Sequence, residues 1–286
     1  MRATPILLIL CVMLFQGCFQ QIAVGSLTGI MEDGFLVLNE ESDLALAEAG
    51  IASNLKLLES VLRSEPDNDR VLLMTCRGYA SYAMGFVEDA DPVRARGFYR
   101  RGLDYGLRLF PPESAIGRSL RSDPAGLSDA LRRASKSDVP AIFWTAVAWG
   151  SAISLDRTNT DALAELPRVE EMIAWVREKD PGYFYGGADF FLGTLKGSKP
   201  PIFGGDTAAS RAHFERALEI NGGKFLLTYV YYARHYAVQT LDSVLFAGLL
   251  TAVDTASIDI LPEARLSNAI AKRKAVLFRK KFDASF

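Results

Sequence analysis

The chain has 286 residues, of which 49% are hydrophobic and 23% are charged, a composition typical of a folded globular protein. Its 32 basic and 34 acidic residues nearly balance, and this argues against nucleic acid as a partner, because such proteins gather a basic excess on one face. Two histidines and three cysteines are too few for most zinc sites and for a disulfide framework, so we expect no metal and no cofactor.

The N-terminus has the pattern of a secretory signal peptide over residues 1–17. Arg2 supplies the positive charge, and an unbroken apolar run follows at residues 6–15 (ILLILCVMLF). These ten residues, at ~1.5 Å each, are too short to cross a hydrocarbon core of ~30 Å. Gly17 and Cys18 then resemble the end of a bacterial lipoprotein box, which predicts a lipid on Cys18. A secreted protein without lipid, or a short hydrophobic N-terminal helix, remains the alternative.

The rest of the chain divides into two parts. Residues 18–40 are predicted to be a tether that leads into the folded body, and residues 41–286 a helical domain. Apolar residues recur three and four positions apart between Leu44 and Leu62, which predicts a helix over 42–64. The same reasoning predicts further helices over 69–86, 93–109, 127–134, 141–155, 162–178, 183–195, 207–220, 225–239, 242–253 and 263–282.

Polar residues at the expected helix starts support these boundaries. The segment 65–68 (EPDN), ending at Asn68, is predicted to supply the cap of the helix that starts at 69, and Asp91 and Asp206 are predicted N-caps. Asp91 is followed by a proline at the first helical position, and Thr160–Asp161 is predicted to cap the helix over 162–178. No alternating apolar and polar run with hairpin turns appears, so no sheet is required. The fold class predicted is therefore all-α.

The helix breakers indicate a repeat. Three of the four intervals between Pro66, Pro111, Pro181, Asn221 and Pro262 are roughly 40–45 residues, a period typical of helix-turn-helix repeats. Phe214 with Ala217 has the best match to the aromatic and small residues that let tetratricopeptide helices approach. We predict a tetratricopeptide-like solenoid of helical pairs, with a general antiparallel bundle as the alternative.

Catalytic chemistry has little support in the sequence. Neither His213 nor His235 has a partner at metal-ligand spacing, and no nucleophile–base pair or paired carboxylates emerge. Cys76 lies in an apolar run (VLLMTC) and is expected to be a small buried residue. We therefore expect a protein that is not an enzyme.

The placement of the large aromatic residues is the strongest indication of a ligand-binding pocket. Large rings concentrate on the predicted first helices of the pairs, which line the concave wall of a helical solenoid, so they could line a pocket for an apolar ligand or simply fill the core. The candidate ligand-binding aromatics are Tyr79, Tyr82, Phe86, Trp144, Trp149, Tyr185 and Phe190. Asn54 and Lys56 interrupt an apolar helix segment and are candidates for a polar headgroup anchor, with simple exposure as the alternative.

Four segments resemble the T component of TRAP transporters, a tetratricopeptide-like periplasmic lipoprotein. They are LAEAGIASNLKLLESVLRSEPDN (46–68), RGYASYAMGFVEDADPVRARGFYRRGLDYGLRLF (77–110), FGGDTAASRAHFERALEINGGKFLLTYVYYARHYAVQTLD (203–242) and LPEARLSNAIAKRKAVLF (261–278). They cover more than a third of the chain, from end to end.

This resemblance implies a periplasmic lipoprotein, anchored to a membrane through its N-terminal lipid. It implies the solute-binding P subunit as protein partner, a homotrimer as assembly, and an apolar channel or cleft through each protomer. Together with the aromatic wall, it leads us to expect an accessory subunit that binds an apolar or amphipathic small molecule. The alternative is an envelope scaffold that binds protein partners without a small ligand.

Overall fold

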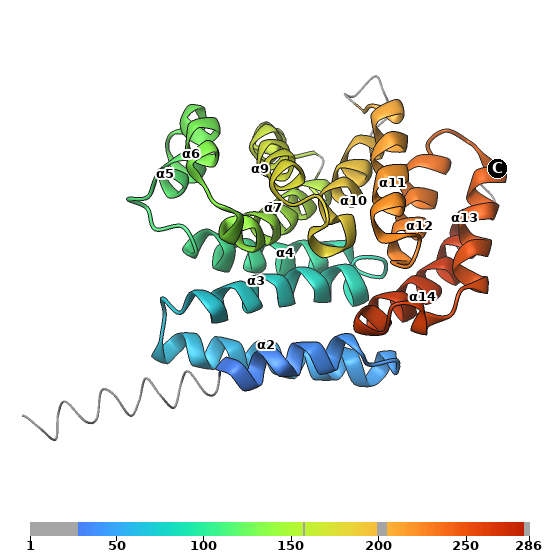
Figure 1. Ribbon diagram of the computed structural model, residues 1–286, viewed down its shortest axis with the longest axis horizontal. Coiled ribbons are helices and arrows are strands. Elements are labelled where there is room, and N and C mark those ends of the chain that lie inside the picture. Colours follow the sequence, from blue (N-terminus) through green and yellow to red (C-terminus); the bar gives the residue numbers. More distant parts are fainter. Residues whose placement is uncertain (1–27, 157, 199–204, 283–286) are drawn as a thin grey trace, which may run out of the picture.

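The computed structural model describes residues 28–156, 158–198 and 205–282, and within these ranges every regular element is a helix (Figure 1). The predicted all-α class is confirmed. Residues 28–39 are helical. The α-helices that follow are α2 (Leu44–Ser64), α3 (Asp69–Tyr82), α4 (Pro92–Arg108), α5 (Ala115–Arg121), α6 (Leu127–Arg133), α7 (Val139–Ser154), α8 (Thr160–Ala164), α9 (Leu166–Lys179), α10 (Tyr183–Gly197), α11 (Thr207–Asn221), α12 (Leu227–Tyr232), α13 (Ser243–Thr255) and α14 (Arg265–Phe282).

Short polar side chains begin many of these helices. The carboxylate of Asp91 accepts a hydrogen bond from the Arg94 backbone N–H at 3.0 Å, and Pro92 occupies the first helical position. Asn68 and Asp206 cap α3 and α11 in the same way. Each cap satisfies a backbone donor that the helix itself leaves unpaired, and the predicted caps at these three positions are confirmed.

The helix predicted over 162–178 was wrong in its continuity. Asn159, rather than Thr160–Asp161, caps the short α8, and a second helix, α9, starts at Leu166 with a proline in its first turn. Pro167 has no N–H to donate to the preceding turn, so the break falls directly before it. The sequence prediction also missed α5 and the helix over 28–39, whose Met31 is buried in the core.

Two helices end in π-helical turns, Ala83–Val87 after α3 and Ala233–Ala237 after α12. In each, the following backbone N–H bonds to the carbonyl five residues back, Glu88 to Ala83 and Val238 to Ala233. A π-turn inserts an extra residue and changes the direction of the side chains that follow. Glu88 and Asp89 directly follow the first turn and Arg234 lies in the second, and all three belong to one charged cluster, described below.

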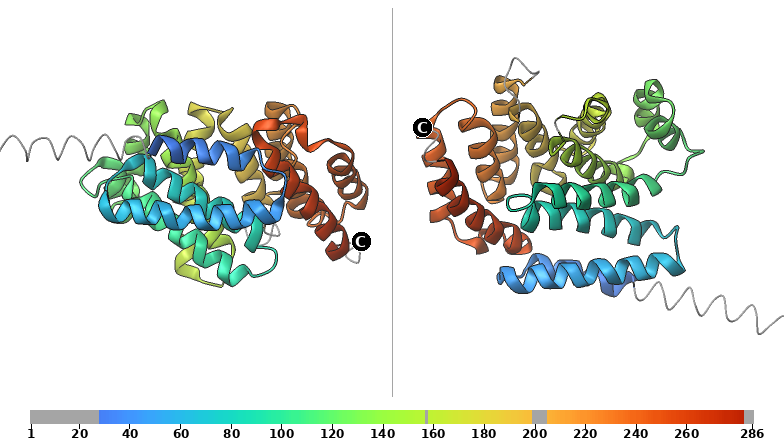
Figure 2. Two further views of the ribbon diagram at one scale, coloured as in Figure 1. Left: turned by 90° about the horizontal axis from the view of Figure 1, so that it is seen from below. Right: turned by 180° about the vertical axis from the view of Figure 1, so that it is seen from behind.

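Consecutive helices pack on one another along the chain, in a curved row from α2 through α7 and α10 to α14 (Figure 1). The row returns on itself, because α14 packs against α2 at the other end of the sequence (Figure 2). Arg265 Nη1 donates to the Glu40 carbonyl oxygen at 3.0 Å across this contact. In a solenoid of helical pairs each helix packs on the helices next to it in the sequence, and this arrangement is observed here. That the pairs are tetratricopeptide repeats stays a prediction.

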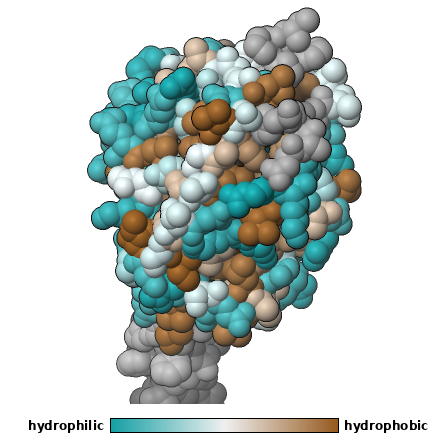
Figure 3. Space-filling view, turned by 90° about the vertical axis from the view of Figure 1, so that its right-hand side faces the viewer, coloured by the Kyte–Doolittle hydropathy of each residue, from teal (hydrophilic) through white to brown (hydrophobic). Residues whose placement is uncertain are grey.

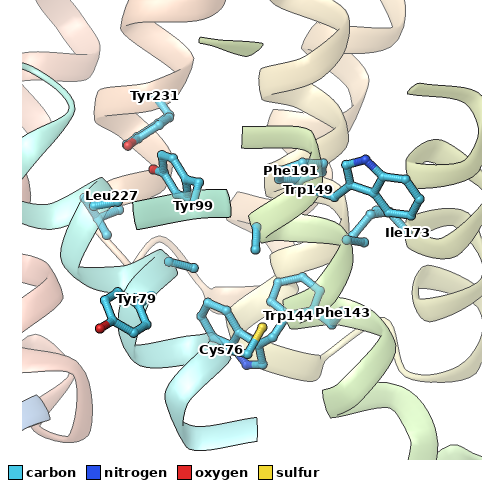
Figure 4. Packing of buried hydrophobic residues seen from close by; sticks show 14 of the residues in the cluster. Cys76, Tyr79, Tyr99, Phe143, Trp144, Trp149, Ile173, Phe191, Leu227 and Tyr231 are labelled. Carbon is cyan, nitrogen blue, oxygen red and sulfur yellow. The ribbon is translucent and has the colours of Figure 1, made fainter. Parts of the chain in front are cut away.

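A contiguous apolar core runs between the helices (Figure 4). Close packing of α3, α4 and α7 depends on Gly106, where an added Cβ would lie 2.6 Å from Thr145 Oγ1 and 3.0 Å from Cys76 Sγ. Cys76 is fully buried in this contact, as expected, and burial raises the pKa of its thiol to about 12. The thiol is therefore a packing group that is not ionised at neutral pH.

A buried charged cluster joins the segment after α3 to α4, α12 and α14. We call it the Glu88 network, and its members are Glu88, Asp89, Tyr99, Tyr231, Arg234 and Lys274. Lys274 on α14 has a side chain only 1% exposed, and its Nζ donates to Glu88 at 3.2 Å and also to Asp89. Arg234 Nη1 donates to Asp89 at 2.9 Å. Two carboxylates thus face two cations, and the network is neutral overall.

The two tyrosines complete the network as donors. Tyr99 Oη donates to Glu88 at 2.7 Å, and the Tyr231 hydroxyl donates to the other oxygen of the same carboxylate. Burial, together with the Glu88 charge, raises the pKa of both hydroxyls well above the usual range, so both keep their protons at neutral pH. Every member of the network therefore has a charged or hydrogen-bonding partner.

Gly106→Ala is expected to lower the free energy of unfolding by about 1–3 kcal/mol, because the methyl group overpacks the contact between α4, α3 and α7. Gly97 is the matched control on the same helix, since no atom lies within 4 Å of a Cβ placed there. Gly97→Ala is expected to raise the free energy of unfolding by up to about 1 kcal/mol. Urea denaturation measures both, and equal shifts would contradict the close packing at Gly106.

Lys274→Met is expected to lower the free energy of unfolding by about 3 kcal/mol or more, because it leaves Glu88 and Asp89 buried with one cation fewer. Lys280→Met, an exposed position on the same helix, serves as the control and is expected to change stability by less than about 0.5 kcal/mol. Chemical denaturation followed by circular dichroism compares the two variants. A loss at Lys274 no larger than at Lys280 would show that the network does not hold α14 to the segment after α3.

Candidate ligand-binding site

An aromatic cavity of about 90 Å³ lies between α7 and α10. Figure 4 shows part of its wall, with Phe143 and Trp144 on α7, Phe191 on α10, and the Tyr99 and Tyr231 rings beside each other. The apolar lining residues are Met84, Phe143, Trp144, Val147, Leu155, Phe184, Phe190, Phe191, Leu195 and Phe225. Such a wall favours an apolar ligand, since large rings offer area without polar groups that need satisfying.

Polar side chains lie along part of the same cavity. Glu88, Tyr99, Tyr231 and Arg234, all members of the Glu88 network, line it together with His235. The hydroxyls of Ser151, Ser154, Thr194 and Ser198 add to this polar side. Because the charges of the network balance within it, this part of the cavity offers hydroxyl groups and no excess of either charge.

A smaller cavity of about 50 Å³ lies next to the first. It is bounded by the helix over 28–39, by α2 and α3, and by α14, with Phe35, Ile51, Phe86 and Ile270 among its lining residues. Met84 and Phe184 line both cavities. These two side chains are therefore the partition between the cavities.

Phe184, one of the two side chains of this partition, has an unusual backbone conformation. Phe184, Tyr185 and Gly186 have φ values of 47°, 61° and 80°, so the start of α10 is a left-handed turn. Left-handed conformation costs a non-glycine residue roughly 1–2 kcal/mol, and two aromatic residues adopt it here. Packing of the rings compensates, because Phe184 lies 4.8 Å from Trp144 and Tyr185 stacks at 4.9 Å on Phe225, measured between ring centres.

The structure brings three of the predicted ligand-binding residues to these cavities. Trp144 and Phe190 line the larger cavity and Phe86 lines the smaller one. Tyr185 lines neither, and its ring packs behind the wall on Phe225.

The other predicted residues lie elsewhere. Tyr79 is 1% exposed and donates to Glu59 at 2.5 Å, and Tyr82 packs edge-on against Phe98. Trp149 donates its indole N–H to Glu165 at 2.8 Å under the Arg168 guanidinium, outside both cavities.

Neither candidate headgroup anchor lines the two cavities. Lys56 is exposed and pairs with Glu59 at 2.6 Å, and Asn54 is half-buried elsewhere on α2. Cys18, the predicted lipid attachment site, lies outside the described residues.

Sequence reasoning missed several wall residues. Phe184 belongs to the aromatic run at 183–185, but nothing in the sequence predicts its left-handed backbone. Glu88 and Asp89 carried a usable signal, since two adjacent carboxylates end an otherwise apolar helix. Tyr99 and Tyr231 join them only because α4 and α12 meet in the fold.

Clusters of metal-ligating side chains and membrane-spanning helices are both absent from the described part of the chain. No group of three or more histidine, cysteine or acidic side chains is placed there to hold a metal ion. None of the helices described combines the length and the apolar composition needed to cross a bilayer. His213 Nδ1 lies 2.7 Å from Asp189 Oδ1, away from both cavities.

Comparison with known proteins supplies the family. No curated protein matches the chain. The family model described as TRAP transporter T-component matches residues 40–286, which is nearly all of the helical body. That family consists of transport components and is not a family of enzymes. The chain therefore belongs to the T-component family of TRAP transporters.

Proposed function

We propose that this protein is a periplasmic lipoprotein accessory subunit of a TRAP-type transport system, which binds the solute-binding P subunit and holds an apolar or amphipathic solute in its aromatic cavity. Family membership supports the transport role. The single observation that carries the ligand is the cavity between α7 and α10, with its aromatic wall and its polar side. One water molecule needs about 10–15 Å³ of such space, so the cavity accommodates a chain of several small groups.

The anchoring and assembly belong to the same proposal. A lipid on Cys18, after removal of residues 1–17, would hold the protein at the membrane, with residues 18–27 as the tether before the helix over 28–39. The tetratricopeptide-like arrangement of helical pairs and the homotrimer are expectations that come from the family resemblance. The succession of packed helices is consistent with the first of them.

The alternative function is an envelope scaffold that binds protein partners without a small ligand. Large apolar side chains are exposed on the α13–α14 side, among them Leu241 and Val244, which are 70% and 82% exposed. In Figure 3 apolar side chains on this side lie in separate patches among hydrophilic ones. A partner-binding surface is usually one contiguous apolar patch, so this side of the molecule gives the scaffold little support.

Val147→Trp is expected to abolish uptake of an alkyl ligand, because the indole fills the larger cavity from α7. The control is Trp149→Phe on the same helix, which leaves both cavities unchanged. Uptake of radiolabelled dodecanol by the purified full chain measures the difference, with circular dichroism to confirm folding. Full uptake by a folded Val147→Trp variant would remove the cavity as the binding site and favour the scaffold.

A tagged full chain extracted from membranes with mild detergent is expected to co-purify with a solute-binding P subunit, and native mass spectrometry is expected to show three copies of the chain. A chain that co-purifies without any P subunit would contradict the proposed partner.

Cys18→Ser is expected to move the protein from the membrane to the soluble fraction, because the acyl chains supply the anchor. Cys76→Ser, at the buried thiol, is the control and stays with the membrane. A Cys18→Ser variant that remains in the membrane fraction would contradict the proposed lipid anchor.

A further inference from the structure

Arg77 on α3 lies in a cage of aromatic rings. Its guanidinium carbon is 5.4 Å from the centre of the Trp144 ring, 5.6 Å from that of Phe184 and 5.9 Å from that of Phe35. The side chain lines the smaller cavity, and two of the three rings also belong to the wall of the larger one. Arg77 therefore lies where the two cavities meet.

This guanidinium has no anionic partner in the part of the chain that the structure describes. No ion pair and no hydrogen bond of its side chain is formed there, whereas Arg234 pairs with Asp89 and Arg101 bonds to the Tyr79 hydroxyl. Burial lowers the pKa of Arg77, against an opposing influence of the Tyr183 and Tyr185 hydroxyls. The side chain is half-buried, an arginine keeps its charge at neutral pH, and withdrawing a charge from water without a counter-ion is costly.

The surroundings of Arg77 suit an oxyanion. Ser81 and Ser267 line the same small cavity, as does Asn39, and their hydroxyl and amide groups can donate to anionic oxygens. The Glu88 end of the larger cavity differs, since its two carboxylates already pair with Arg234 and Lys274. Among the described residues that line the two cavities, the unpaired positive charge is that of Arg77.

We propose that Arg77 binds the oxyanion headgroup of an amphipathic ligand with a single alkyl chain, and that the chain passes between Met84 and Phe184 into the aromatic cavity. This inference rests on the proposed function and specifies its ligand as an apolar tail with an anionic headgroup, either a carboxylate or a phosphate monoester. It replaces Lys56, which is exposed and paired with Glu59, as the polar anchor. The left-handed turn at Phe184 fixes the ring beside which the tail enters.

The test compares four ligands with the same twelve-carbon tail, dodecanoate, monododecyl phosphate, dodecanol and dodecylammonium, by calorimetric titration of the full chain at pH 8. The anion that fits the site is expected to bind about ten-fold or more tightly than dodecanol, because it forms charge-assisted hydrogen bonds with the guanidinium. Dodecylammonium is expected to bind more weakly than dodecanol. Whichever of the two anions binds more tightly identifies the headgroup as carboxylate or phosphate.

Arg77→Gln is expected to abolish the preference for the anion and to leave the affinity for dodecanol unchanged. Arg94→Gln is the matched control, because Arg94 also stacks on a ring, 5.1 Å from the centre of Phe98, but is exposed and lines neither cavity. This control is expected to retain the full preference. Circular dichroism and thermal melting establish that both variants are folded.

The outcomes separate the two proposals. If dodecanol binds but neither anion binds more tightly, or if a folded Arg77→Gln variant keeps the preference, the anion site is overturned while the apolar cavity stands. If none of the four ligands binds, the anion site and the ligand-binding function both fail.

Discussion

The fold depends on charge pairing between segments that are far apart in the chain. Lys274 lies 186 positions after Glu88, yet its ammonium group bonds to Glu88 and Asp89 with 1% of the side chain exposed. Removing one partner from such a pair is far more costly than removing an exposed one, because the remaining charge stays buried. The pairing thus fixes where α14 returns to the end of α3, and with it the shape of the smaller cavity, which both helices border.

Two unfavourable features meet at the junction of the cavities. Phe184 and Tyr185 adopt a left-handed backbone, and the half-buried Arg77 has no counter-ion among the described residues. Structures retain such costs mainly at functional sites, where surrounding contacts hold the strained residues in place. The coincidence of strain, an unpaired charge and an aromatic wall at one place is the main physical reason for proposing a ligand site there.

The sequence allowed accurate prediction of the local structure and only partial prediction of the site. Apolar periodicity and caps such as Asp91 located most helices, because both act within one helical turn. The aromatic wall was recognised, but Trp144 and Trp149, both on α7, illustrate the limit. At 3.6 residues per turn they point about 140° apart, so one lines the cavity and the other bonds to Glu165. The helices that pack against α7 decide which of its faces lines the cavity, and the sequence of α7 does not reveal them.

The sequence by itself determined the all-α class, the positions of most helices, the burial of Cys76 and the resemblance to the T-component family, since periodicity, caps and motifs are local properties. The tertiary structure alone decided the Glu88 network, the left-handed turn at Phe184 and the isolation of Arg77. Each of these depends on which distant segments meet. The energy of a buried charge or a strained backbone is set by those neighbours, and the residue type does not reveal them.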